Sequence, residues 1–345
     1  MDSRHCCSRR TFLGGSFLGG IAGLGLSALT RPLLHAQAKP HRIDVHHHLF
    51  TPEFRAASAA NGGNTPPWSV EQSLGEMDRN GIQTALLSIN PPGIWFGDVQ
   101  QSRRLSRGIN DMAAKMRSDH PGRYGQFTVI PLPDIEGSLR EIEYGYDTLK
   151  ADGIALMTNY GDRWLGDASF APVWEELNRR KAVVYTHPVT ANCCKVIKDE
   201  VGAGSIEWPT DTTRTIASLV FSGTAARYPE IRWIFSHGGG TLPFLLGRFL
   251  RQEREMKEKG QRLMPKGLMY ELNRFYYDTA QAVHPGALAA LLKFAPVSQV
   301  LYGTDYPFAP GVDENEGLSA QHFPAQDLLA IERGNALKLL PGIKG

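Results

Sequence analysis

The chain has 345 residues, of which 42% are hydrophobic and 21% are charged, and its formal net charge is +2. This is an ordinary globular composition with enough apolar material for one sizeable core, and the charge balance gives no basic patch that would indicate nucleic acid or a membrane surface. The length would allow two domains, but α/β barrels commonly fill it as one.

The first 38 residues have the three parts of an export signal. Arg9-Arg10 forms a twin-arginine pattern with its neighbours, residues 14–29 form a glycine-rich apolar stretch, and Ala36-Gln37-Ala38 is a small-x-small cleavage site. The stretch is short and broken by glycines, so a membrane-spanning anchor is the weaker interpretation. We predict that residues 1–38 are a twin-arginine signal peptide, that residues 39–345 form the catalytic domain, and that the mature protein is periplasmic.

Removal of this segment changes the charge balance. The segment carries four arginines against one aspartate, so the mature chain has 33 basic and 34 acidic residues. The apparent basicity therefore belongs to the signal. We expect a small-molecule substrate, no nucleic-acid partner and no stable membrane insertion after the signal is removed.

After the signal, eight β-rich runs alternate with segments of helical period. The runs are Arg42–His48, Thr84–Asn90, Gln126–Leu132, Gly153–Thr158, Ala182–His187, Arg232–His237, Arg274–Asp278 and Val300–Thr304. Apolar residues recur at helical spacing between them, over residues 70–77, 139–149, 170–177 and 216–220. Eight alternating units predict an α/β fold with a parallel sheet closed into a single (β/α)₈ TIM-type barrel. An open doubly wound sheet is the alternative, but no glycine-rich dinucleotide fingerprint follows the first run.

Two connections are longer than a turn requires, from Leu49 to about Trp68 and from Pro188 to about Thr210. Long loops after strands lie at the carboxyl face of a barrel, where active sites lie, so we expect both to act as lids. The second contains Cys193 and Cys194, and adjacent cysteines rarely bridge because the geometry is strained. A buried or loop-lining thiol pair is the favoured interpretation, over a metal or redox role.

His46 and His48 end the first run. Side chains two apart on a strand point to the same side, so both can enter the barrel mouth while His47 faces the helices. This is the arrangement that a metal requires from two imidazoles on a rigid backbone.

Polar residues close three further runs at the same end of the barrel. His187 ends the fifth run, His237 ends the sixth, and Asp305 follows the eighth. A packed core histidine is the ordinary explanation for any one of them. The convergence of all of them at strand ends, where catalytic residues of barrels lie, instead predicts a metal centre.

These segments resemble the amidohydrolase-related family. The matching motifs are Ile43-Asp44-Val45-His46-His47-His48, Thr186-His187-Pro188, His237-Gly238-Gly239-Gly240, Gly303-Thr304-Asp305-Tyr306-Pro307-Phe308, Asp211-Thr212-Thr213 and Arg333-Gly334-Asn335-Ala336. The resemblance runs through the mature chain. The subgroup that it resembles is that of the aminocarboxymuconate-semialdehyde decarboxylase-like enzymes, which include methylsalicylate-type aromatic decarboxylases.

The resemblance implies one zinc ion, held by His46, His48, His187 and Asp305. It also implies that His237 lies beside the metal-bound water and transfers protons. Binuclear relatives add a carboxylated lysine on strand four, whereas residues 153–158 contain neither Lys nor Glu. This difference indicates a mononuclear site.

Five further residues are candidates for contact with the substrate. Arg248 resembles a family arginine that reaches a substrate carboxylate, in some members across a dimer interface, and a helix-surface arginine is the alternative. We expect a homodimer. Trp95, Phe96, Trp208 and Phe308 fall in predicted mouth-side loops and could stack on a flat ring or pack at the rim.

Two reactions are compatible with these residues. The first is non-oxidative decarboxylation of an aromatic or unsaturated carboxylic acid, with His237 supplying the proton that replaces CO₂. The alternative is hydrolysis of a lactone or amide-like bond, in which zinc hydroxide attacks a carbonyl, Asp305 takes its proton and His237 polarises the oxygen. A metal-storing protein would need neither Arg248 nor a proton-transfer set. Fold and metal site do not separate the two reactions, because one scaffold hosts both.

Overall fold

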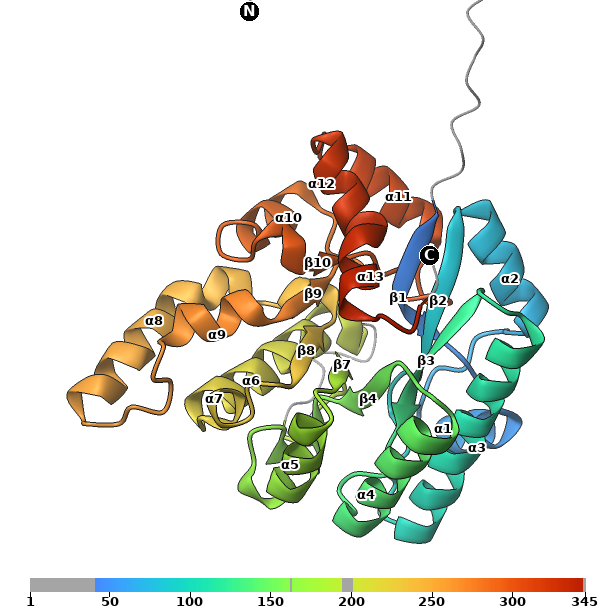
Figure 1. The fold of residues 1–345 in the computed structure, drawn as a ribbon, viewed down its shortest axis with the longest axis horizontal. Coiled ribbons are helices and arrows are strands. Elements are labelled where there is room, and N and C mark those ends of the chain that lie inside the picture. The colour runs from blue at the N-terminus through green and yellow to red at the C-terminus, as the bar shows by residue number, and fades with distance from the viewer. Residues whose placement is uncertain (1–40, 162, 194–200, 344–345) are drawn as a thin grey trace, which may run out of the picture. The chain divides into compact units, whose positions relative to one another are not determined.

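A ring of parallel strands forms the centre of the unit over Lys39–Gly345. The computed structural model describes residues 41–161, 163–193 and 201–343. Eight parallel strands pair in the order β1-β2-β3-β4-β7-β8-β9-β10, and helices surround them (Figure 1). The predicted (β/α)₈ barrel is confirmed. The predicted signal, residues 1–38, lies outside the described residues.

The barrel strands follow the predicted order. They are β1 (Arg42–His48), β2 (Ile82–Ser88), β3 (Tyr124–Val129), β4 (Gly153–Met157), β7 (Val183–His187), β8 (Arg232–Phe235), β9 (Tyr276–Asp278) and β10 (Val300–Leu301). After β4 the chain adds an unpredicted antiparallel hairpin, β5 (Asn159–Tyr160) with β6 (Arg163–Trp164).

Helices connect the strands on the outside of the barrel. They are α1 (Pro52–Ala60), α2 (Val70–Arg79), α3 (Val99–Asp119), α4 (Ile135–Glu143), α5 (Ala171–Arg179), α6 (Glu207–Phe221), α7 (Thr224–Arg227), α8 (Leu242–Glu258), α9 (Leu268–Arg274), α10 (Pro285–Leu291), α11 (Gly311–Ser319), α12 (Ala325–Leu329) and α13 (Asn335–Leu339). No helix in the described part of the chain is both long enough and apolar enough to cross a membrane.

The strands are buried on both faces, which explains their nearly continuous apolar sequences. All five residues of β4 are buried, with inward side chains packed inside the barrel and outward ones covered by helices. The helices are apolar on one side only. In α2, the Ser69 side chain accepts a hydrogen bond from the backbone N–H of Gln72 and so begins the helix, while Met77 is buried against the barrel.

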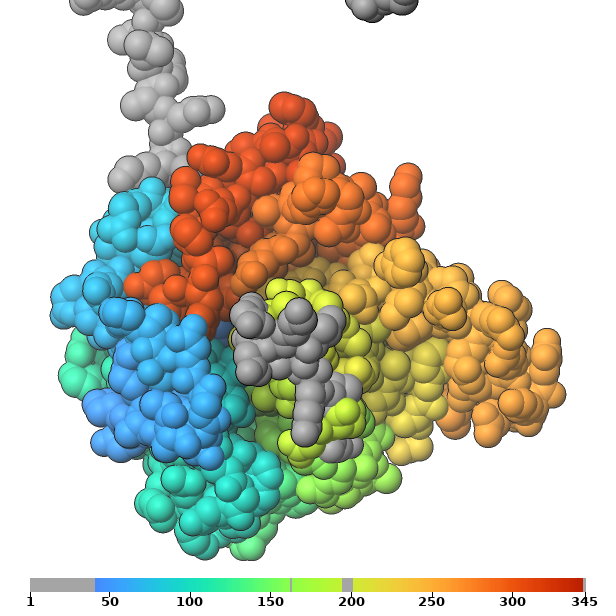
Figure 2. Space-filling view, turned by 180° about the vertical axis from the view of Figure 1, so that it is seen from behind, coloured from blue at the N-terminus to red at the C-terminus, as the bar shows by residue number. Residues whose placement is uncertain are grey.

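The segment that follows β10 closes the barrel onto β1. The backbone N–H of Val45 donates to Tyr302 O (3.0 Å), and that of His48 donates to Tyr306 O (2.9 Å). In return, Asp305 N–H donates to His46 O (2.9 Å). The first and last parts of the unit, blue and red in Figure 2, accordingly lie side by side. This closure carries Asp305 to the two predicted ligands of β1.

Several predicted strand ends are wrong by one to three residues: β2 and β3 lie two to three residues earlier than predicted, and three further ends differ because of tertiary contacts. Arg274 ends α9, where its guanidinium bonds Glu271 and the carbonyl oxygens of neighbouring segments, so β9 begins only at Tyr276. Regular pairing of β10 stops at Leu301 because the chain there leaves β9 for β1. β8 ends at Phe235, and His237 begins a 3₁₀ turn rather than ending the strand.

Two motifs of the family resemblance support the frame of the barrel. The buried carboxylate of Asp211 on α6 accepts hydrogen bonds from Thr158, from Asn159 (2.8 Å) and from Trp164 (2.9 Å), which fastens the hairpin to the helix. Asn335 donates to the carbonyl oxygens of residues 297 and 300, both at 2.8 Å, and so holds the start of β10. Both motifs are thereby explained by packing.

Candidate metal centre

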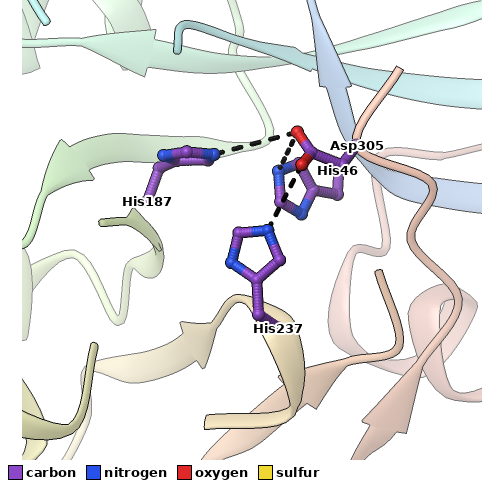
Figure 3. Close-up of side chains that lie close together, drawn as sticks. All are labelled: His46, His187, His237 and Asp305. Carbon is purple, nitrogen blue, oxygen red and sulfur yellow. Dashed lines mark hydrogen bonds and ion pairs between the residues drawn. The ribbon is translucent and has the colours of Figure 1, made fainter. Parts of the chain in front are cut away.

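Four titratable side chains meet at the carboxyl end of the barrel. One ligand atom from each of His46, His187, His237 and Asp305 lies within 4.8 Å of the corresponding atom of every other. Figure 3 shows His187 and His237 pointing toward the Asp305 carboxylate from different segments. His48 joins this group through Asp305, whose Oδ1 lies 3.0 Å from His48 Nε2. All the residues predicted for the metal centre are thus brought together.

The alternation of β1 places its histidines as expected. His46 and His48 point into the barrel, where their ring centroids lie 5.0 Å apart, and each lies 5.0 Å from the ring of His187. His47 points outward, where its ring nitrogens lie 3.0 Å from Asp44 Oδ2 and 2.8 Å from the Ser73 hydroxyl on α2. The middle histidine is therefore a structural residue.

The hydrogen bonds of His46 and His187 use Nδ1 and leave the Nε2 atom of each ring facing Asp305 Oδ1. His187 Nδ1 donates to the carbonyl oxygen of Pro188 (2.9 Å), and His46 Nδ1 donates to Asp278 Oδ2 (2.9 Å). Each of these Nδ1 atoms therefore carries a proton, and each Nε2, the ring nitrogen left to bind an ion, is buried with no hydrogen-bond partner among the described residues. Two orphaned imidazole nitrogens beside a carboxylate fit a divalent metal ion.

The charges of the cluster favour a cation. Burial lowers the pKa of His48 to about 3 and that of His187 to about 4, so both rings are neutral. Burial acts in the same direction on His46, but the carboxylates of Asp278 and Asp305 outweigh it and raise that pKa to about 10. Burial acts to raise the pKa of Asp305, but His46 and hydrogen bonds from the neighbouring imidazoles hold it well below its usual range. The two buried carboxylates beside the neutral rings of His48 and His187 stabilise positive charge in the cluster.

His237 approaches from a tight turn rather than from a strand. Its backbone is left-handed (φ 55°), and its Nε2 lies 3.3 Å from Asp305 Oδ2. The glycines that follow it allow the turn: a Cβ on Gly240, itself at φ +67°, would lie 1.9 Å from the Pro209 carbonyl oxygen. The side chain of His237 is 10% exposed, whereas that of Asp305 is 2% exposed. His237 is thus the accessible member of the cluster.

Two adjoining cavities open beside His237. One of about 300 Å³ is lined by Gly204, Ser205, Trp208, Pro209, His237, Gly240, Gln281, Ala282 and Ala287. The other, about 350 Å³, is mostly apolar and shares His237, Gly240, Ala282 and Ala287 with the first. In the described part of the chain, the four predicted metal ligands line neither cavity. His237 therefore stands between the cluster and the space that a substrate can occupy.

The predicted aromatic contacts divide into two groups. Trp208 lines the smaller cavity, where its Nε1 donates to the Thr190 hydroxyl (3.1 Å), although it lies on α6 rather than in a loop. Phe308 packs against the ring of His48, with 5.6 Å between centroids. Trp95 and Phe96 are half-buried against the hydrophobic core. These last three line neither cavity beside His237.

Arg248 is exposed on α8. Within the described residues, its side chain forms no hydrogen bond or ion pair and lines neither cavity beside His237. The structure of one chain therefore does not bring the predicted substrate contact to the cluster.

Two residues of the site were not predicted. Asp278, at the end of β9, touches both His46 and the backbone of His237. Gln281 lines the smaller cavity and donates from Nε2 to Asp305 Oδ2 (2.5 Å). Asp278 carried a detectable signal, because it also closes a predicted strand with a polar residue. Gln281 lies in a loop with no such pattern.

Comparison with known proteins gives one consistent set. The profile of the amidohydrolase family matches residues 43–342. Decarboxylase yanB of Aspergillus niger is 38% identical over 325 residues, covering 87% of this chain and 87% of the relative. The 6-methylsalicylic acid decarboxylase of Penicillium expansum is 35% identical over 316 residues, covering 88% and 97%. The 2-amino-3-carboxymuconate-6-semialdehyde decarboxylase of Dictyostelium discoideum is 28% identical over 251 residues, covering 71% and 68%.

A solved structure shares the fold. The 5-carboxyvanillate decarboxylase of Novosphingobium aromaticivorans, complexed with manganese and 4-hydroxy-3-methoxy-5-nitrobenzoic acid, superposes with a TM-score of 0.77. The likeness covers 87% of this chain and 96% of that one, at 21% sequence identity.

Proposed function

The chain belongs to the amidohydrolase family, and from this premise we propose that it is a metal-dependent carboxy-lyase that removes CO₂ from an aromatic carboxylic acid without a redox step. Relatives that cover 87% and 88% of the chain are decarboxylases, so the predicted subgroup is confirmed. The observation that carries the proposal is the position of His237, which touches the ligand cluster on one side and lines the adjoining cavities on the other.

The proposed roles follow from this position. His46, His48, His187 and Asp305 would hold one divalent ion, which supplies a Lewis acid for the oxygens of the substrate when bound. His237 delivers a proton to the ring carbon that bears the carboxyl group. The bond between that carbon and the carboxyl carbon then breaks, its electron pair returns to the ring, and CO₂ leaves. Trp208 offers a flat face in the cavity for the ring.

The substrate that we propose is a monocyclic acid of the salicylate type. A 6-methylsalicylate decarboxylase is among the relatives, and a cavity of about 300 Å³ accommodates a single substituted ring. The purified mature protein should release CO₂ from 6-methylsalicylate or 2,6-dihydroxybenzoate and should leave lactones intact. Ring opening of a lactone without CO₂ release from any aromatic acid would favour the hydrolytic alternative.

We propose zinc as the ion, because three imidazole nitrogens and one carboxylate form a donor set typical of Zn²⁺. Manganese is the competing candidate, since it occupies a related decarboxylase. Metal analysis of the purified protein should give about one divalent ion per chain, predominantly zinc. Two ions per chain, or full activity after chelation, would contradict the mononuclear scheme.

The proposed location is the periplasm, reached by the twin-arginine route. It rests on the sequence of residues 1–38 alone. Replacing Arg9 and Arg10 by lysines should leave the precursor in the cytoplasm of a bacterial host. Normal processing after Ala38 and a periplasmic double-Lys protein would contradict this route.

A homodimer is proposed from the surface of α8. Phe244 is 88% exposed there, one helical turn before Arg248, and it lines the larger apolar cavity. A second copy packed on this surface would bury Phe244 and bring its own Arg248 toward the neighbouring site. Sedimentation should give a dimer for the native chain and a monomer for Phe244→Glu. A monomeric native protein would contradict the proposal.

A further inference from the structure

We infer that Asp278 is the positioning residue of the centre: one carboxylate sets the orientation and tautomer of a metal ligand and anchors the backbone of the proton donor. This inference rests on the proposed metal site. Asp278 lies at the end of β9 and is fully buried. A buried carboxylate is costly unless its lone pairs are satisfied, so its partners indicate its role.

The two oxygens of Asp278 have different partners. Oδ2 accepts the hydrogen bond from His46 Nδ1 (2.9 Å). Oδ1 accepts from the backbone N–H groups of His237 (2.8 Å) and Ala280 (3.2 Å). The carboxylate therefore joins β1, which carries two ligands, to the turn that carries His237.

The bond at Oδ2 determines which nitrogen of His46 can bind metal. A carboxylate only accepts hydrogen bonds, so Nδ1 of His46 carries a proton and Nε2 is the ring nitrogen left for the metal. That Nε2 faces Asp305 Oδ1 at 3.1 Å. The ring is thus fixed both in rotation and in tautomer, as ligand histidines require.

The bond at Oδ1 stabilises an uncommon backbone. His237 is a non-glycine residue with φ 55°, a conformation that costs free energy unless its surroundings hold it. A charged acceptor on its N–H is among the stronger hydrogen bonds available for this purpose. The left-handed turn directs the imidazole toward Asp305 and the cavity.

Gly303 makes the arrangement sterically possible. A Cβ at this position would lie 3.0 Å from His46 Cβ and 3.1 Å from Asp278 Cβ. Both distances are tighter than ordinary Cβ contacts, so a side chain at this position would require His46 or Asp278 to shift by a few tenths of an ångström. The glycine of the Gly303-Thr304-Asp305 motif therefore leaves room for His46 and Asp278 to lie side by side.

The test uses Asp278→Asn, because an amide can accept hydrogen bonds at only one of the two positions that the carboxylate oxygens occupy. Two N–H donors hold the oxygen of the new amide at the Oδ1 position, so its NH₂ group faces His46 Nδ1. His46 must then accept at Nδ1 and carry its proton on Nε2, the nitrogen that the metal needs. We expect the dissociation constant for Mn²⁺, measured by calorimetric titration of the metal-free protein, to rise 10- to 100-fold.

A matched control is Tyr185→Phe. Tyr185 is also fully buried, its ring lies 5.3 Å from that of His46, and its hydroxyl has no hydrogen-bond partner among the described residues. Its Mn²⁺ affinity should stay within about twofold of the native value. A native affinity retained by Asp278→Asn would overturn the inference and leave the proposed function standing, whereas a native protein that binds no metal would remove the proposed function itself.

A measurement on the native protein covers the case in which Asp278→Asn does not fold. The ring ¹⁵N shifts of His46 in the Zn²⁺-loaded protein should show a protonated Nδ1 and a metal-bound Nε2. Metal bound at Nδ1, or a proton on neither nitrogen, would overturn the assignment without any substitution.

Discussion

Two buried carboxylates each hold one histidine of the same three-histidine run, on opposite faces of β1. The inner pair, Asp278 with His46, faces the cluster. The outer pair, Asp44 with His47, faces α2 and the closing segment: Asp44 also accepts from the N–H and the hydroxyl of Thr304, at 3.0 and 2.6 Å. The distances within the two pairs, 2.9 and 3.0 Å, are almost the same.

The difference between the pairs lies in the second ring nitrogen. His47 Nε2 is hydrogen-bonded to the Ser73 hydroxyl at 2.8 Å, so both ring nitrogens of the outer pair have partners. The outer pair thereby joins β1 to α2 and to the segment that closes the barrel. His46 Nε2 has no hydrogen-bond partner among the described residues, so the inner pair is incomplete without a further ligand. A buried Asp–His pair thus indicates function only where one nitrogen is left without a partner.

The substitution with the largest expected effect on the metal cluster is His187→Ala. It removes one of the two orphaned Nε2 atoms from the cluster, so we expect metal content to fall from about one ion per chain to near zero. Turnover should fall on the order of 10³-fold or more, since the Lewis acid is lost with the ligand. His41→Ala, at an exposed histidine at the start of the barrel, is the control. A metal-loaded His187→Ala enzyme would contradict the ligand assignment.

His237→Asn separates proton transfer from metal binding. Asparagine tolerates the left-handed backbone, so the turn should persist and the ion should stay bound. We expect turnover to fall by about 10²- to 10⁴-fold with a nearly unchanged melting temperature. Metal content, melting temperature and turnover should be measured on one preparation. If metal and activity disappear together, His237 is a ligand; if a stable, loaded variant turns over normally, the proton-transfer role is wrong.

His47→Ala tests the outer side. It removes the imidazole that bonds both the Asp44 carboxylate and the Ser73 hydroxyl, and with it a ring that stacks on Tyr306. We expect a loss of roughly 2–3 kcal/mol in the free energy of unfolding of the metal-free protein. The Mn²⁺ affinity of the folded variant should change less than threefold. A large loss of affinity at unchanged stability would show that the two pairs do not have separate roles.

The sequence predicted the inner and outer faces because strand alternation is a local property. His46, His47 and His48 were assigned to their faces from the period of two alone, and His187 and Asp305 from their places after apolar runs. The pairing of these histidines with their carboxylate partners could not be predicted in the same way. Asp278 meets His46 across a gap of 232 residues, and only the closure of the barrel brings them together.

The predicted strand boundaries were also wrong where contacts with distant parts of the chain determine the backbone conformation. The apolar run before His237 predicted a strand up to that residue, but the glycines after it and the anchor at Asp278 turn the chain two residues earlier. The hairpin after β4 has strands of two residues each, too short for a periodic signal. Its stability comes instead from Asp211 on α6.

A third buried carboxylate, Glu314 on α11, has fewer hydrogen-bond partners than Asp278 or Asp44. Its Oε2 accepts from the N–H of Gln281 at 3.3 Å, but its Oε1 has no partner among the described residues. Burial raises the pKa of Glu314 well above its usual range, and the nearby carboxylate of Asp278 adds to the rise. Glu314 is therefore protonated in the folded protein under conditions in which it ionises in the unfolded chain.

The sign of the resulting pH dependence follows from proton linkage. Because the folded state binds this proton more tightly than the unfolded state, the stability that it contributes is complete below the usual glutamate pKa and is lost as the pH rises above it. Glu314→Gln keeps the shape and the neutral state without taking up a proton, so it should stabilise the protein at pH 7–8 by the free energy that proton uptake costs there, on the order of 1–3 kcal/mol. The gain in stability should shrink toward zero near pH 4.

The exposed Glu316→Gln on the same helix makes the same charge change and should shift the melting temperature little at either pH. Equal shifts for the two variants, or a gain from Glu314→Gln that grows as the pH falls, would contradict a buried neutral Glu314.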